Sequence, residues 1–141
     1  APFAISKELV KKLVWLSPHF RQAVIMLQDE FVQKISAKPG DELYGASSVW
    51  TQNFLRVEPL RLIGPQNFLP PPKVSSRVVR LTPLVEPNKG KGLDESVLRP
   101  DMLQDYHRFL ESCFRRRNKK LVSILSDISP HAPDTKQMFA P

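Results

Sequence analysis

The chain has 141 residues, a usual length for one domain, and a formal net charge of +7 that favours a polyanionic partner such as nucleic acid. Hydrophobic residues make up 41%, which excludes intrinsic disorder of the whole chain, and a single cysteine excludes a disulfide framework or a cysteine-based zinc finger. No apolar run reaches the roughly 18 residues that a membrane helix needs, so we expect no membrane partner.

The first part of the chain predicts helices mixed with strands. Ser6 is a candidate N-cap for a helix that runs to about Leu16, and residues 29–37 predict a second, shorter helix. Between them, the continuous apolar run at residues 23–27 is typical of a strand buried on both faces, as in a parallel sheet. Residues 47–57 are ambiguous and read as a short helix leading into a strand that residues 60–63 extend.

The remaining elements divide the chain near residue 87. A stiff loop is expected around Leu69-Pro70-Pro71-Pro72, followed by a strand over residues 78–81. Residues 86–100 read as a linker, and a helix is predicted over residues 101–116. Asn118 is a candidate cap for a last helix through residue 125. We therefore predict one mixed unit over residues 1–87 and a helical unit over residues 88–141.

A search for common catalytic sets is mostly negative. The sequence Gly90-Lys91-Gly92 lies in the linker and follows no strand, so it predicts no phosphate loop. The three histidines lack metal spacing, and no metal site is expected. Cys113 falls on the apolar stripe of a helix, which favours a place in the core. Asp29 and Glu30 are adjacent and point apart on a helix, so a solvated role in its first turn is favoured.

Two features carry a functional signal. Five cations lie in the stretch Arg115, Arg116, Arg117, Lys119 and Lys120, at an expected break between helices. They fit either contact with RNA or DNA phosphates or a solvated helix end that complements the helix dipole. Phe3 and Phe68 each lie beside prolines, which limit backbone freedom. Such rings either stack on a nucleobase or fill the core.

Several motifs in order resemble one family. Residues 20–30 read FRQAVIMLQDE and resemble the family pattern FRxAVLMxQxE. Residues 37–40 read AKPG and residues 44–49 read YGASSV, similar to AKPG followed by YGxLSV. Residues 68–81 read FLPPPKVSSRVVRL and resemble FxPPPKVxSxVVRL. Together they resemble the ribosomal RNA adenine dimethyltransferases, whose relatives include macrolide-resistance rRNA methylases and mitochondrial transcription factor B proteins.

The resemblance implies an α/β fold: the C-terminal part of a class I, Rossmann-like methyltransferase sheet followed by a small α-helical domain. Residues 1–87 would be the C-terminal portion of the catalytic domain, and residues 88–141 a helical RNA-binding domain, incomplete at its end. Residues 47–63 and 77–82 would form the closing hairpin. Ala1-Pro2-Phe3 matches the end of the family's catalytic loop, with Ala in place of the usual Leu. The Gly-rich loop and acidic residue that bind S-adenosylmethionine in the family would lie upstream, so we expect this cofactor to be bound mainly outside this chain, with Ala1 at its edge.

The family resemblance also implies roles for named residues. Phe3 and Phe68 would hold a flipped adenine between two aromatic faces. The carbonyl oxygen of Pro2 would accept a hydrogen bond from the adenine amine. The RNA phosphates would be bound by Lys73, Arg77, Arg115, Arg116, Arg117, Lys119 and Lys120.

The implied function is S-adenosylmethionine-dependent dimethylation at N6 of adenines near the 3′ end of small-subunit rRNA, as a step in small-subunit biogenesis. The alternative within the family is a non-catalytic assembly or transcription factor that binds rRNA without methylating it. An unrelated basic RNA-binding domain is the third possibility. The implied partner is the small-subunit rRNA or its precursor particle, the protein is expected to be monomeric, and the compartment is the cytoplasm or the mitochondrial matrix.

Overall fold

A computed structural model describes the backbone of residues 3–84 and 100–128, and the side chains of residues 5–84 and 101–125. The described helices and strands are α1 (Phe3–Trp15), β1 (Ala23–Gln28), α2 (Asp29–Ser36), α3 (Ala46–Gln52), β2 (Leu55–Ile63), β3 (Ser76–Pro83), α4 (Pro100–Arg115) and α5 (Leu121–Ile128). Short 3-10 turns follow α1 at Ser17–His19 and β2 at Pro65–Asn67. The predicted linker, apart from Pro100, and residues 129–141 lie outside the described residues.

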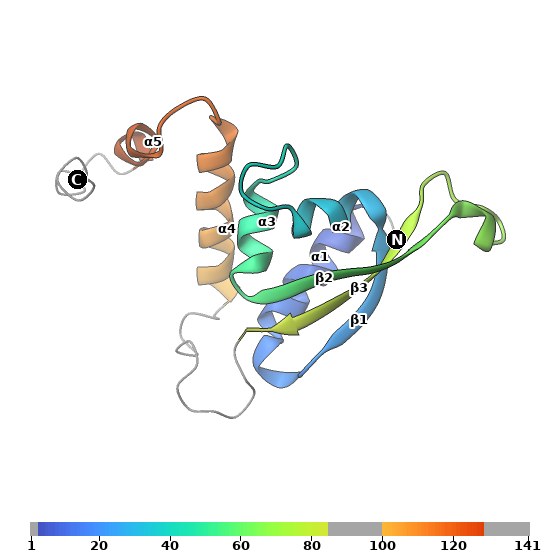
Figure 1. Ribbon diagram of the computed structural model, residues 1–141. Helices are drawn as coiled ribbons and strands as arrows, with labels where there is room; N and C mark the ends of the chain where they lie inside the picture. Colours follow the sequence, from blue (N-terminus) through green and yellow to red (C-terminus); the bar gives the residue numbers. More distant parts are fainter. Residues whose placement is uncertain (1–2, 85–99, 129–141) are drawn as a thin grey trace.

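The three strands form one antiparallel sheet in the order β1-β3-β2 (Figure 1). In the central strand β3, Val79 lies opposite Ile25 of β1, and Leu81 lies opposite Val57 of β2. The register of β2 shifts between Pro59 and Leu62. The predicted hairpin of β2 and β3 is confirmed, as is the short helix before it.

The two faces of the sheet have different surroundings. One face packs against α1, α2 and α3, with Leu27, Leu55 and Leu81 at most 1% exposed. On the other face Val24 and Met26 are 53% and 45% exposed. The expectation that residues 23–27 form a strand buried on both faces of a parallel sheet is therefore wrong for this structure. The run pairs antiparallel to β3, and its alternate side chains point to opposite faces.

The ends of two helices differ from the sequence expectation. The first helix begins at Phe3, not after Ser6. Ser6 lies one and two turns before Val10 and Val14, and all three are buried on the core side of α1. Ser6 therefore lies inside the helix and is not its N-cap. The last helix begins at Leu121, because the chain first closes a turn in which the Lys119 amide donates to the Arg116 carbonyl at 3.0 Å. Asn118 is therefore not its cap.

Side chains of α3 hold the end of α2. The Gln52 amide donates to the carbonyl oxygens of Ile35 and Ala37 at 2.9 and 2.8 Å, and the Ser48 hydroxyl donates to the Lys34 carbonyl at 2.6 Å. These bonds satisfy carbonyls that the end of a helix leaves without partners. The chain then turns at Gly40, whose φ of +99° is a conformation that favours glycine.

Helix α4 belongs to the same hydrophobic core as the sheet. Its Leu103 and Leu110 are buried together with residues of α1, α2 and α3. The indole N–H of Trp50 in α3 donates to the Leu103 carbonyl at 3.4 Å, and the rings of Phe54 and Tyr106 meet edge to face at 6.3 Å. The predicted division near residue 87 falls outside the described residues and stays a prediction, but α4 packs directly on the first unit.

Candidate functional site

Phe68 lies in the connection between β2 and β3, which projects from one end of the sheet (Figure 1). The 3-10 turn before it is closed by the Asn67 amide donating to the Gly64 carbonyl and the Phe68 amide donating to the Pro65 carbonyl, both at 3.1 Å. Three prolines follow within four residues, at positions 70–72. The ring is therefore carried by a backbone with little freedom to move, as the prolines predict.

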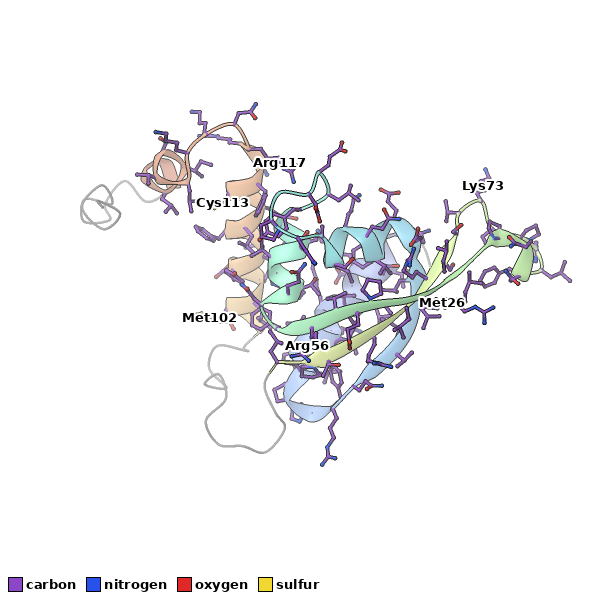
Figure 2. The ribbon with its side chains drawn as sticks, viewed as in Figure 1. Met26, Arg56, Lys73, Met102, Cys113 and Arg117 are labelled. Carbon is purple, nitrogen blue, oxygen red and sulfur yellow. The ribbon has the colours of Figure 1, made fainter. Side chains whose placement is uncertain are left out.

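The ring of Phe68 borders a surface pocket of about 350 Å³. Its lining residues are Met26, Arg61, Leu62, Ile63, Asn67 and Phe68. Met26 reaches this pocket from β1, on the open face of the sheet, and Figure 2 shows it at the base of the projecting connection. Phe68 is half-buried and is absent from the hydrophobic core. The interpretation that Phe68 fills the core is thus not supported, and its ring remains accessible at a pocket.

The other predicted catalytic residues are described only in part. Helix α1 begins at Phe3, and Figure 1 shows this beginning at the same end of the sheet as the β2–β3 connection. Residues 63 and 76 pair with each other there, and Ser76 also pairs with Gln28 at the end of β1. Ala1, Pro2 and the side chain of Phe3 lie outside the described residues. The facing of Phe3 and Phe68 across an adenine therefore stays a prediction.

Arg77 is held by an ion pair at the base of this connection. Its Nε donates to Asp29 Oδ1 at 2.5 Å and its Nη1 donates to the Leu60 carbonyl at 3.3 Å. Both side chains are mostly buried, with 24% of Arg77 and 18% of Asp29 exposed. The expectation of a solvated role for Asp29 is wrong, because β3 brings a guanidinium to the start of α2. Contact of Arg77 with RNA stays a prediction. Its guanidinium already donates to two oxygens, those of Asp29 and of the Leu60 carbonyl.

The predicted RNA-binding residues fall into two separate groups. Lys73 is exposed at the tip of the β2–β3 connection, whereas Arg117 lies at the far end of α4 (Figure 2). Arg115, Arg116, Lys119 and Lys120 are all exposed around the turn that joins α4 to α5. One RNA would have to extend across the molecule to contact both groups.

Arg117 differs from its neighbours because it contacts the first unit. Its Nη1 donates to the Glu42 carbonyl at 3.1 Å, and its Nη2 donates to the Tyr44 carbonyl. Its guanidinium also lies 5.9 Å from the ring centre of Phe114, which in turn meets Tyr44 edge to face at 5.8 Å. Arg117 therefore fastens the end of α4 to the loop before α3.

The remaining candidate residues take structural positions. His107 is buried, its ring meeting Trp50 edge to face at 5.6 Å. Burial, followed by the charge of Lys7, lowers the pKa of His107, so its ring is neutral near pH 7. Cys113 is partly buried, and burial raises the pKa of its thiol, which disfavours the reactive thiolate.

Neither a metal centre nor a membrane span is found in the described part of the chain. Over residues 5–84 and 101–125 no three His, Cys, Asp or Glu side chains come together in a way that could hold a metal ion. None of the helices described is both long and apolar enough to cross a membrane.

Sequence reasoning missed five pocket residues: Met26, Arg61, Leu62, Ile63 and Asn67. Met26 was hidden because every residue of its run is apolar, so no alternation indicates which side chains leave the core. Arg61 lies at the register shift of β2 and Asn67 in the 3-10 turn that follows this strand, and no local pattern indicates that they line one pocket. The functions of Arg117 and Asp29 as fastening residues had no local signal, because their partners are far away in the chain.

The family model described as "Ribosomal RNA adenine dimethylase" matches residues 1–139. The chain belongs to the ribosomal RNA adenine dimethylase family. A probable dimethyladenosine transferase of Dictyostelium discoideum is 42% identical over 123 residues, which are 87% of this chain and 36% of that protein. A ribosomal RNA small subunit methyltransferase of Arabidopsis thaliana is 41% identical over 91% of this chain and 33% of that protein. The chain thus spans about a third of these relatives.

Solved structures agree with the family. A crystal structure of a dimethyladenosine transferase from Plasmodium falciparum superposes with a TM-score of 0.70 at 31% identity, over 89% of this chain and 42% of that one. The 23S rRNA methyltransferase ErmE superposes with a TM-score of 0.60 at 23% identity, over 95% of this chain and 49% of ErmE, which shows a shared fold. The predicted family and α/β fold class are confirmed.

Proposed function

We propose that this chain is the base-positioning and RNA-contacting part of an S-adenosylmethionine-dependent rRNA adenine-N6 dimethyltransferase that acts on small-subunit rRNA. The observation that carries the proposal is the position of Phe68 within a chain of this family. Its half-buried ring borders a pocket of about 350 Å³, on a connection stiffened by prolines, at the end of the sheet where α1 begins. The substrate is a base within RNA, so it must leave its stack before it can be modified.

The pocket is suited to a base and not to the cofactor. Its walls combine apolar and polar surface: Met26, Leu62 and Ile63 lie beside the aromatic ring, and Asn67 and Arg61 supply polar groups. A nucleobase gains from a ring face and from a few hydrogen-bonding groups at its edge. No carboxylate lines the pocket to accept hydrogen bonds from ribose hydroxyls. This pocket therefore lacks groups that would hold the ribose of S-adenosylmethionine, and we propose that the cofactor is bound chiefly by residues outside it.

We assign the residues of this chain to binding and orientation. Phe68 supplies one face for the adenine, and Phe3, at the beginning of α1, supplies the second. The carbonyl of Pro2 accepts a hydrogen bond from the exocyclic amine, whose lone pair is delocalised into the purine ring and needs such an acceptor to become more nucleophilic. Holding the amine in place removes much of the entropic cost of the reaction.

Phosphate contacts come from the two basic groups. Lys73 lies on the same connection as Phe68, and we assign it to the RNA backbone close to the target base. The exposed cations Arg115, Arg116, Lys119 and Lys120 bind more distant phosphates, as point charges or through the forked guanidinium. This arrangement suits one folded RNA, such as the small-subunit rRNA or its precursor particle, bound by a monomer.

The decisive experiment replaces Phe68 in the full-length enzyme. Base–aromatic stacking is worth about 1–3 kcal/mol, so Phe68→Ala should slow methyl transfer by about 5- to 150-fold. Phe68→Tyr should retain most of the rate, because it keeps the ring. Leu69→Ala is the matched control, since Leu69 is the next residue and is 98% exposed. Methyl transfer to small subunits and binding to the same particles are measured in parallel.

The outcomes separate the proposal from its alternative. Slower transfer with nearly unchanged binding in Phe68→Ala supports the stacking assignment. Unaltered transfer in Phe68→Ala rejects it. A wild-type protein that binds small subunits and transfers no methyl group would identify the non-catalytic relative instead.

A further inference from the structure

A second pocket of about 470 Å³ lies between α1, α3 and α4, away from the β2–β3 connection. Trp50 and His107 are buried there, at 4% and 7% exposure, and both rings border the pocket. The volume falls in the range of about 300–1,000 Å³ that is usual for small-ligand sites, so one nucleotide fits and a duplex does not. We call this pocket the α1–α4 groove.

The groove carries more positive than negative side chains. Lys7, Lys11, Lys12 and Arg108 line it together with Glu8 and Glu111. The acids are already paired: Lys7 Nζ lies 3.1 Å from Glu111 and Lys11 Nζ lies 2.9 Å from Glu8. Lys12 makes no ion pair within the described residues, and Arg108 Nη1 lies 3.6 Å from the exposed Asp105, which is not among the groove's lining residues. The charge excess therefore favours an anionic occupant.

An aromatic face lies beside these cations. Trp15 lines the groove and is 49% exposed, unlike Trp50, which is in the core. Trp15 follows Lys11 by four residues and Lys12 by three, so both lysines are its neighbours on the helix surface. His107 is held neutral by its burial, which makes the floor of the groove uncharged. The groove thus combines a stacking surface, an uncharged floor and cations at its rim.

We propose that the α1–α4 groove binds a single-stranded RNA segment, with a nucleobase on Trp15 and phosphates on Lys11, Lys12 and Arg108. The inference rests on the proposed function only in taking RNA as the partner, and it adds a site at a distance from Phe68. An acidic peptide would use the cations but has no need of the exposed indole beside them. Base–aromatic stacking with cations along the backbone is the general way in which proteins bind single strands.

Tryptophan fluorescence reports directly on this groove, because the chain has two tryptophans and Trp50 is buried. The probe is an adenine-rich single-stranded RNA of ten nucleotides, titrated into the chain. We expect quenching on binding. Trp15→Phe should abolish most of the quenching while keeping most of the affinity measured by RNA anisotropy. Trp15→Ala should weaken binding by about 5- to 150-fold, with thermal melts checking that each variant is folded.

Charge variants test the phosphate contacts. Lys12→Gln should lower the steepness of the salt dependence by about 0.7, the value for one phosphate contact on a single strand. Lys38→Gln is the matched control, because Lys38 is an exposed lysine on the loop after α2, outside the groove. Its salt dependence should remain that of the wild type.

Three results would overturn the inference. If RNA binds without quenching Trp15 fluorescence, and Lys12→Gln leaves the salt dependence of binding unchanged, the RNA binds elsewhere on the protein. The proposed function then still stands. A polyglutamate peptide that quenches Trp15 as strongly as RNA at equal charge makes the groove a peptide site. Absence of any RNA binding rejects the groove and the RNA-contacting function together.

Discussion

The two faces of the three-stranded sheet differ in how much their side chains contribute to the core. The covered face carries Leu27, Val79 and Leu81, which are almost fully buried under the helices. The open face carries Val24 and Met26 and the exposed pair of Arg80 and Glu58, whose charged atoms lie 3.8 Å apart. The pocket beside Phe68 includes Met26 and so opens on the second face. Residues that hold the fold are thus kept apart from those that line this pocket.

The largest expected effect lies on the covered face. Leu81→Ala should lower the free energy of unfolding by about 2–5 kcal/mol, because it leaves a cavity in a well-packed core. Met26→Ala on the open face should cost less than about 1 kcal/mol, since the side chain is 45% exposed. Urea denaturation of both variants measures the difference. Equal losses would show that the two faces do not differ in this chain.

The next effect concerns the ion pair that joins the start of α2 to β3. Asp29→Asn should lower the free energy of unfolding by about 1–3 kcal/mol, because it weakens a charge-assisted bond to the mostly buried Arg77. The exposed pair Arg80–Glu58 is the matched comparison, and Glu58→Gln should cost at most about 1 kcal/mol. Denaturation at low and high salt should show the larger salt sensitivity for the exposed pair. A larger loss of stability in Glu58→Gln than in Asp29→Asn would contradict this prediction.

A smaller effect is expected where α4 extends the covered layer. Arg117→Lys should lower the free energy of unfolding by about 0.5–1.5 kcal/mol, since a single ammonium cannot reproduce the fork that binds the Glu42 and Tyr44 carbonyls. Arg115→Lys, at the exposed end of α4, serves as control and should be close to neutral. An RNA-binding loss in Arg117→Lys without a stability loss would make Arg117 a phosphate ligand and not a fastening residue.

The smallest effect is a pH dependence from His107. Its pKa in the folded chain lies below the ordinary value of 6.5 because it is buried, so below that value the unfolded chain takes up a proton that the folded chain does not. Stability should therefore fall as the pH decreases from 7 to about 5.5, above the range in which carboxylates titrate. His107→Phe, which keeps a ring against Trp50, should flatten this slope. A slope unchanged in His107→Phe would assign the dependence to another group.

Local patterns predicted the elements well and their surroundings less well. The prolines at 70–72 and the apolar spacing in residues 101–116 predict a stiff connection and a helix, because both depend on neighbouring residues. The environment of residues 23–27 could not be predicted, since an all-apolar run does not reveal which face is covered. Asp29 and Arg117 acquire partners 48 and 75 residues away, which only the fold determines. The family motifs made Phe68 a candidate residue, whereas the place of Met26 at the same pocket could be seen only from the fold.

The outer edge of β1 has a consequence for handling the protein. Within the residues that the structure describes, β1 pairs with β3 on one side only, and Ala23–Leu27 contains no charged residue or proline. Such an edge offers free backbone donors and acceptors to any other extended chain. Natural sheets usually protect their edge strands from such pairing with a lysine, a bulge or a covering loop. We therefore expect a preparation of these 141 residues to aggregate less at low protein concentration. The substitution Val24→Lys is the simplest way to improve its solubility.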